Sequence, residues 1–136
     1  NGYRRALAEY NIPIDESYIY KNDYSFKSGS DAAEYFLNLP EPPTAIFAIS
    51  DIHAMGAINK AISLGINVGK ELAIIGFDNI MFTKIFTPSV STVSQPGYEM
   101  GSLVVEKLIN NIQGGIQDRR EYILPHEIIL RQSTGD

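Results

Sequence analysis

The sequence predicts an α/β fold whose parallel sheet is flanked by helices on both faces. Two runs, residues 45–49 and 72–77, are continuously apolar, whereas a strand with one face in water alternates apolar and polar residues. Stretches with apolar residues at helical spacing separate these runs. The chain of 136 residues is long enough for one domain with a hydrophobic core. We therefore expect strands and helices to alternate around a single core.

Two helices are expected ahead of the first apolar run. The first extends to about Asn11 and breaks at Pro13, and a short extended stretch over 18–20 and a polar loop follow it. The second follows residues 28–31, which have capping-box spacing. Its apolar face holds Ala32, Ala33, Phe36 and Leu37, and prolines at 40, 42 and 43 close it.

The middle of the chain has the pattern strand, helix, strand. The apolar run 45–49 predicts a strand, and Met55, Ile58, Ala61 and Ile62 then recur at helical spacing as far as Gly65. The run 72–77 predicts the next strand. This alternation is typical of a parallel sheet with helical crossovers.

The last third of the chain predicts one strand, one long helix and two short strands. Residues 90–93 are β-rich, and the helix after Pro96 presents Met100, Leu103, Val104 and Leu108 on one side before ending at Gly114 and Gly115. Extended pieces at 121–124 and 127–130 are separated by Pro125. We expect both pieces to form strands.

Composition excludes several classes of function for this segment. Eleven basic and sixteen acidic residues give a net charge of −5, the wrong sign for a surface that neutralises phosphates. No apolar run approaches the roughly 20 residues that cross a bilayer, so membrane insertion is excluded. The absence of cysteine excludes disulfides, thiolate nucleophiles and zinc–thiolate sites. The segment alone is therefore not expected to bind DNA or to contact a membrane.

Two acidic residues follow the predicted central strands and mark a candidate site. Asp51 comes after the first apolar run and Asp78 after the second. Ligands of parallel α/β sheets bind beyond the carboxyl ends of the strands, so both carboxylates are expected at that edge. Structural alternatives stand beside this reading: Asp51 could be the N-cap of a helix starting at Ile52, and Asp78 could be only a turn residue before Asn79.

Two other side chains could border the same edge. Tyr24 lies in a polar loop, 22–25, and could offer an aromatic face to a ligand, with partial burial in the core as the alternative. Gln95 marks the start of the last helix, where capping is the simplest role.

Catalytic constellations are missing, and we expect no enzyme, no metal and no cofactor. The chain has neither a G-x-S-x-G nor an H-E-x-x-H motif, and His53 and His126 are isolated in the sequence. Residues 75–78 carry one glycine where the dinucleotide fingerprint needs three. An acid/base pair of Asp51 and Asp78 is conceivable, but nothing in the sequence supplies a nucleophile or a metal cluster.

Four short motifs cover nearly the whole chain. They are residues 45–51 followed by Ala54, Gly56 and Ala57, then LAIIGFDN at 72–79, TPSVSTVSQP at 87–96, and IILRQST at 128–134. Their order and spacing resemble those of the LacI/GalR family of transcriptional regulators, which carries D-x-x-A-x-G, P-x-L-T-T-V-x-Q-P and L-I-x-R-x-S-T at the corresponding places.

The resemblance implies a fold of the periplasmic-binding-protein-like type I, with two α/β lobes around a small-molecule cleft. On that pattern, residues of about 1–93 and 126–136 belong to the C-terminal lobe, and about 97–125 are a piece of the N-terminal lobe. The helix-turn-helix region that binds DNA in the family is not in this chain. The implied function is small-molecule sensing and dimerisation within a cytoplasmic repressor.

The resemblance also assigns ligand-binding roles to five residues. Tyr24 matches the loop aromatic that stacks on the ligand, Asp78 the acid that hydrogen-bonds it, and Gln95 the crossover glutamine near the cleft. Ser50 stands at a small polar position where some sugar-binding members have asparagine, and Asp51 either meets the ligand or caps the helix. An aromatic face and a carboxylate suit a sugar, and they also suit a nucleoside or purine.

The implied partners are a small-molecule effector, a second copy of the chain, and operator DNA. The homodimer would form through the C-terminal lobe, where Met55 and Phe86 match interface positions, with ordinary core packing as the alternative. Operator DNA would be reached only through the N-terminal region. The nearest rival is the periplasmic sugar-binding protein of a transporter, and the strings STVSQP and LRQST favour the regulator.

Overall fold

The computed structural model describes residues 2–114 and 121–136 and has a four-stranded sheet in the order β1-β2-β3-β4. The strands are β1 (Ala45–Phe47), β2 (Ala73–Phe77), β3 (Ser91–Ser94) and β4 (Glu127–Ile129). The first three are parallel, and β4 is antiparallel to β3. The helices are α1 (Gly2–Glu9), η1 (Glu16–Tyr18), α2 (Phe26–Leu37), α3 (Asp51–Ser63), α4 (Phe82–Ile85), α5 (Gly97–Ile112) and η2 (Gln132–Thr134). The predicted α/β class with a mainly parallel sheet is confirmed.

The register of the sheet places the ends of three strands at one edge. Phe47 of β1 is level with Ile75 of β2, and Phe77 of β2 is level with Val93 of β3. Because these strands run in the same direction, the residues that follow them emerge at the same side of the sheet. The predicted site residues after β1, β2 and β3 are brought together in this way.

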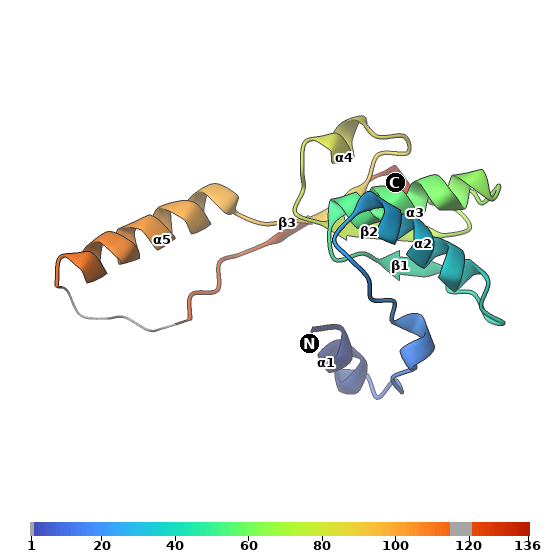
Figure 1. The fold of residues 1–136 in the computed structure, drawn as a ribbon, viewed down its shortest axis with the longest axis horizontal. Helices are drawn as coiled ribbons and strands as arrows, with labels where there is room; N and C mark the ends of the chain where they lie inside the picture. The colour runs from blue at the N-terminus through green and yellow to red at the C-terminus, as the bar shows by residue number, and fades with distance from the viewer. Residues whose placement is uncertain (1, 115–120) are drawn as a thin grey trace.

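Helix α3 packs on β2, and α2 packs closely against α3 (Figure 1). Two glycines permit this approach: a Cβ on Gly29 would overlap the backbone oxygen of His53, and one on Gly56 would overlap that of Phe26. Ile58, Leu72 and Ile74 are fully buried between the helices and the sheet. The opposite face is covered only in part by the described residues, since Phe47 of β1 stays 56% exposed.

Three local predictions need correction. Helix α2 begins at Phe26 rather than after residues 28–31, because the Ser25 hydroxyl caps it by accepting a hydrogen bond from the Ser28 amide at 3.0 Å. Tyr18 ends the 3-10 helix η1 instead of starting an extended stretch. Residues 121–124 form no strand, because no neighbouring strand among the described residues pairs with them. The predicted helix end at Gly115 lies outside the described residues.

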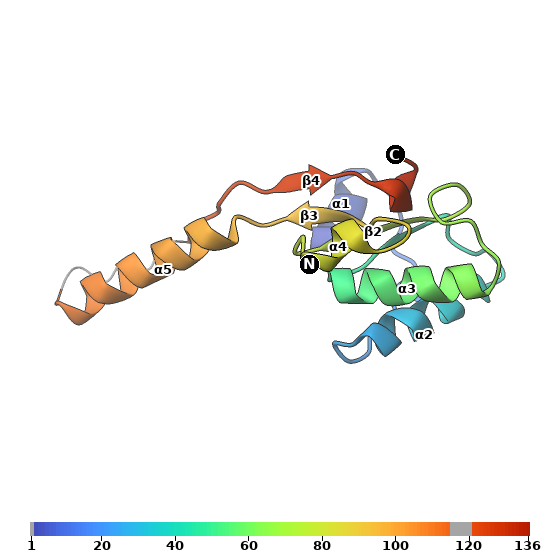
Figure 2. The ribbon, with the colours of Figure 1, turned by 90° about the horizontal axis from the view of Figure 1, so that it is seen from above.

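Helix α5 projects away from the sheet and has no buried residue (Figures 1 and 2). Its exposed apolar side chains include Met100, Val104, Leu108 and Ile112. Such a face normally packs on another element of the same fold. In the part of the chain that the structure describes, no helix is both long and apolar enough to cross a membrane.

The C-terminal segment is fastened between β2 and β3. The fully buried Ser133 hydroxyl donates to the backbone oxygen of Ile74 at 2.6 Å and accepts from the Ser91 amide at 2.8 Å. Arg131, two residues earlier, donates to the backbone oxygen of Val90 at 2.6 Å and to Oδ1 of Asn79 at 3.0 Å.

Candidate functional site

Three of the predicted site residues meet at the carboxyl edge of the sheet. Asp78 follows β2, Gln95 follows β3, and Tyr24 comes from the loop before α2. The Gln95 amide nitrogen donates to Oδ1 of Asp78 at 2.7 Å, and the Tyr24 hydroxyl donates to Oδ2 at 3.4 Å. The Asp78 carboxylate is therefore the common centre of this cluster.

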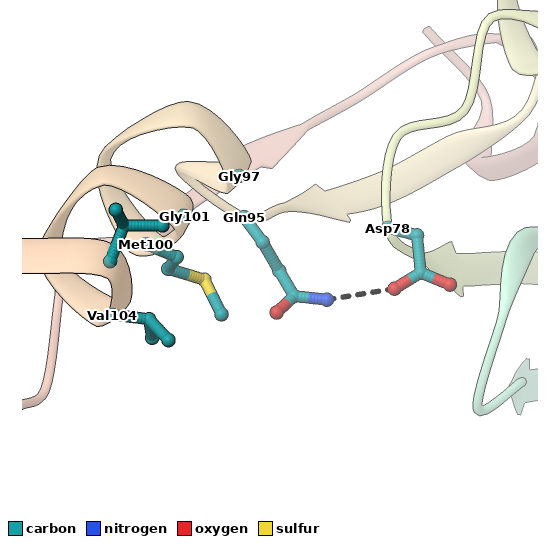
Figure 3. A pocket seen from close by; sticks show the side chains of 7 residues that line it. Asp78, Gln95, Gly97, Met100, Gly101 and Val104 are labelled. Carbon is teal, nitrogen blue, oxygen red and sulfur yellow. Dashed lines mark hydrogen bonds between the residues drawn. The ribbon is translucent and has the colours of Figure 1, made fainter. Parts of the chain in front are cut away.

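A groove of about 560 Å³ lies beside the Asp78 carboxylate. Its walls come from the end of β2, the link after β3 and the first turns of α5; the lining residues are Asp78, Gln95, Gly97, Met100, Gly101, Val104 and Val105. Figure 3 shows the Gln95 side chain reaching across to Asp78, with Met100 and Val104 on the helical side. One polar end and one apolar wall are typical of sites for small organic molecules.

Tyr24 is 65% exposed. It meets the His53 ring in an edge-on arrangement with the centroids 4.9 Å apart. The predicted alternative for Tyr24, partial burial in the core, is wrong. An aromatic face that is open to solvent beside a carboxylate can pack on the C–H side of a ligand.

His53 links the Tyr24 loop to the start of α3. Its Nε2 lies 3.1 Å from the backbone oxygen of Asp23, which can only accept, so Nε2 carries hydrogen. In the neutral ring Nδ1 then accepts from the Ser50 hydroxyl, 2.7 Å away. These bonds give His53 a structural role, since the ring holds the loop that presents Tyr24.

Ser50 is the N-cap of α3 and is buried. Its oxygen faces the His53 amide at 3.4 Å while its hydrogen is directed to the His53 ring. Ser50 therefore lies beneath the Tyr24 loop, and its hydroxyl is engaged within the chain.

Neither role considered for Asp51 agrees with the structure. Ser50 rather than Asp51 caps α3, and the Asp51 side chain is 0% exposed, which leaves no surface for a ligand. Oδ1 accepts from the Thr92 hydroxyl at 2.6 Å and Oδ2 from the Ile80 amide at 2.8 Å. Burial raises the pKa of Asp51, and the bonds from Thr92 and Ile80 oppose this effect.

The turn after β2 has an unusual backbone. Asp78 and Asn79 both have positive φ, at 106° and 56°. Three hydrogen bonds hold Asn79. Its backbone amide donates to the Thr92 hydroxyl at 3.2 Å, and its side-chain nitrogen donates to the Ser94 hydroxyl at 3.1 Å. Its Oδ1 accepts from the Arg131 guanidinium at 3.0 Å. Thr92 and Arg131 belong to the sequence motifs, but their contact with this turn could not be inferred from spacing.

The two predicted interface residues lie inside or against the core. Met55 is 5% exposed and belongs to the core cluster, and Phe86 is partly buried against it. For Met55 this favours the core alternative, since the side chain has almost no surface left for a partner.

The described residues contain no group of three or more His, Cys, Asp or Glu side chains that could hold a metal ion. The polar groups at the groove are a carboxylate, an amide and a phenol. They can donate to and accept from hydroxyl and amine groups, which is the chemistry of reversible binding.

The fold, with a groove at the carboxyl edge of its sheet, is that of a lobe of the periplasmic-binding-protein type. The pattern of the periplasmic binding protein-like domain family matches residues 1–134. The chain belongs to this family, and its relatives include LacI-type transcriptional regulators. The predicted family is thus confirmed.

Individual relatives agree with this assignment. The HTH-type transcriptional repressor CytR of Escherichia coli K12 is 40% identical over 133 residues, which are 98% of this chain and 39% of the repressor. The solved LacI-family regulatory protein from Chloroflexus aggregans has a TM-score of 0.87 and 32% identity, over 97% of this chain and 48% of that one. A solved complex of the transcriptional regulator CelR with cellobiose has a TM-score of 0.89 and 26% identity, over 97% and 40% of the two chains. The chain spans less than half the length of these relatives.

Proposed function

We propose that this chain is the effector-sensing region of a LacI-type transcriptional repressor, and that its effector is a polyhydroxylated small molecule, a sugar or a nucleoside. The single observation that carries the proposal is the Asp78 carboxylate at the wall of the groove, with the exposed Tyr24 ring beside it. A carboxylate accepts hydroxyl hydrogens in fixed directions, and an aromatic face packs on the apolar side of a sugar or base.

The identity of the relatives supports a regulator rather than a transport protein or an enzyme. The relatives named above are all transcriptional regulators, and one of them is solved with a disaccharide, cellobiose. In this proposal the effector contacts Tyr24, Asp78 and Gln95. Ser50 supports Tyr24 through its bond to the His53 ring.

We further propose that the chain contributes to two lobes. Residues of about 1–93 and 126–136 form most of a C-terminal lobe, and α5 with the segment to about 125 belongs to an N-terminal lobe. The projection of α5 and its exposed apolar side support this division. In such an arrangement the groove beside Asp78 lies between the lobes, where closure around an effector would change their relative position.

A homodimer through the C-terminal lobe is also part of the proposal. Met55 cannot contribute much to it, but Met81, Phe82 and Ile85 in and beside the short helix α4 are each more than half exposed. Three adjacent apolar side chains on the surface are typical of a protein contact. Operator DNA would be bound only by a region outside this chain, because the chain carries a net charge of −5.

The function is tested in the full-length protein with an operator selected from random DNA. Glucose, ribose, cellobiose, cytidine and adenosine are titrated into the complex and followed by gel shift. The proposal expects at least one compound to change operator occupancy in the wild type and not in Asp78→Ala, with basal operator binding intact in both. Asp31→Asn, at a partly exposed acid of α2 paired with Lys27, is the control and should respond like the wild type. An equal response in Asp78→Ala would refute the proposal.

A further inference from the structure

The backbone at Asp78 and Asn79 needs external support. Both residues have positive φ, a region that side chains with a Cβ rarely occupy. A conformation of this kind persists only where the surroundings hold it. Since the direction of the Asp78 carboxylate depends on this turn, whatever holds the turn also sets the site.

One buried side chain contacts the turn from below. The Asp51 carboxylate accepts the Ile80 amide at 2.8 Å, directly after the two residues with positive φ. Its other oxygen accepts the Thr92 hydroxyl at 2.6 Å, and Thr92 in turn accepts the Asn79 amide at 3.2 Å. Asp51 thereby fixes two consecutive amides of the turn, one directly and one through Thr92.

Gly76 of β2 leaves room for the Asp51 carboxylate. A Cβ on Gly76 would collide with Oδ1 of Asp51, so the strand has no side chain at the point where Asp51 passes over it. Asp51 is also the first residue of α3, whose cap, Ser50, bonds the His53 ring and through it the Tyr24 loop. Two consecutive residues at the start of α3 therefore hold the site: Ser50 supports the Tyr24 loop and Asp51 supports the turn that carries Asp78.

We propose that Asp51 is a positioning residue for effector binding, which holds the turn of residues 78–80 so that the Asp78 carboxylate faces the groove. The proposal rests on the proposed function of Asp78 as the effector's polar anchor. Asp51 itself does not touch the effector, because it is fully buried. It acts only through the geometry of the turn.

An isosteric substitution separates this role from packing. In Asp51→Asn one acceptor becomes an amide donor of nearly the same size. If the amide faces Ile80, two donors oppose each other; if it faces Thr92, the Thr92 hydroxyl must accept from it and loses its own acceptor. The first orientation removes the bond to the Ile80 amide. The second reverses the bond to Thr92 and leaves the buried Thr92 hydroxyl hydrogen without its acceptor, so either orientation weakens the support of the turn.

The test is a double-mutant cycle in the full-length protein. Wild type, Asp51→Asn, Asp78→Asn and the double variant are titrated by calorimetry with glucose, ribose, cellobiose, cytidine and adenosine, and the tightest binder is followed through the cycle. We expect Asp51→Asn to raise the Kd about tenfold or more in the wild-type background, and less than about twofold when Asp78 is already Asn. A residue that only stabilises the fold would weaken binding by the same factor in both backgrounds.

Thr92→Val is the second variant, and it keeps the test decisive should Asp51→Asn fail to fold. It removes the hydroxyl between Asp51 and Asn79 at constant shape, and its effect on Kd should likewise depend on Asp78. Asp31→Asn should leave Kd unchanged. Unchanged affinity in folded Asp51→Asn, or equal loss in both backgrounds, would overturn the positioning role alone. Unchanged affinity in Asp78→Asn would instead remove the proposed function and the positioning role with it.

Discussion

The amide nitrogen of Gln95 lies 2.7 Å from Oδ1 of Asp78, and this bond joins the link after β3 to the end of β2. Gln95 stands two residues before α5, so the contact connects the acid of the sheet edge to the helix that projects from it (Figure 3). A carboxylate has about four acceptor positions, and Gln95 with Tyr24 uses two of them. The remaining acceptor positions of this groove-lining carboxylate have no partner among these two side chains, and we expect hydroxyl groups of an effector to use them.

Tyr24 should contribute by its ring rather than by its hydroxyl. Tyr24→Ala removes the exposed aromatic face and should weaken effector binding by about 1–2 kcal/mol, or roughly 5- to 30-fold. Tyr24→Phe keeps the ring and loses only the long 3.4 Å bond to Asp78, so its affinity should stay within about threefold of wild type. Calorimetry on the full-length variants checks both values, and an equal loss in Phe and Ala would assign the effect to the hydroxyl.

Ser50 should matter mainly for stability. Its hydroxyl caps α3 and bonds the His53 ring, so Ser50→Ala should lower the free energy of unfolding by about 1–2 kcal/mol. Ser63→Ala is the matched control at the exposed end of the same helix, and it should change stability by less than about 0.5 kcal/mol. Urea unfolding of the two variants provides the comparison. Equal effects would show that the Ser50 contacts stabilise nothing beyond an ordinary surface serine.

The buried Asp51 should give the stability a pH dependence of known sign. Burial raises the pKa of Asp51 above its usual 3.8, so the folded state binds this proton more tightly than the unfolded state. The corresponding stability is fully present below pH 3.8 and is lost as the pH rises through the folded pKa. Because Asp51→Asn cannot titrate, the stability of the wild type minus that of the variant should fall as the pH rises above 3.8. A difference that rises over this range in urea midpoints would contradict the burial effect.

The exposed side chains at α4 should be required for pairing of two copies. Met81→Asp with Ile85→Asp places two charges on this surface and should give folded monomers in sedimentation, with an unchanged circular dichroism spectrum. Ile62→Asp, at an exposed apolar position of α3, is the control and should remain dimeric. A dimer that survives the α4 substitutions would place the interface elsewhere.

Much of the fold could be predicted because its pattern is local. Apolar runs and helical spacing predict two strands, at 45–49 and 72–77, with a helix between them. The structure confirms these three elements and shortens the strands to Ala45–Phe47 and Ala73–Phe77. The start of α2 was wrong by several residues because Ser25 and Ser28 both lie at cap-like spacing, and only the backbone shows which hydroxyl accepts. Strand formation at 121–124 depends on a neighbour that sequence periodicity does not reveal.

The site, too, has features that could be predicted from the sequence and features that could not. Parallel strands bring their carboxyl ends together, so the juxtaposition of Asp78 and Gln95 could be expected from the strand order. The burial of Asp51 could not be predicted, because it depends on the space above Gly76 and on the turn of residues 78–80, which covers the carboxylate. The choice between interface and core for Met55 stayed open for a related reason, since a family position says nothing about how far α2 covers α3.

The central claim is that Asp78 anchors a small-molecule effector. Losing two hydrogen bonds to a charged acceptor, each worth about 1.5–3 kcal/mol, should weaken binding roughly a hundredfold or more. The most direct measurement is calorimetry on full-length wild type and Asp78→Ala with glucose, ribose, cellobiose, cytidine and adenosine. We expect one of these compounds to bind the wild type and to lose at least about a hundredfold in affinity in Asp78→Ala, with the circular dichroism spectrum unchanged. Equal affinity of the two proteins for that compound would show that Asp78 is only a turn residue and would contradict the proposed site.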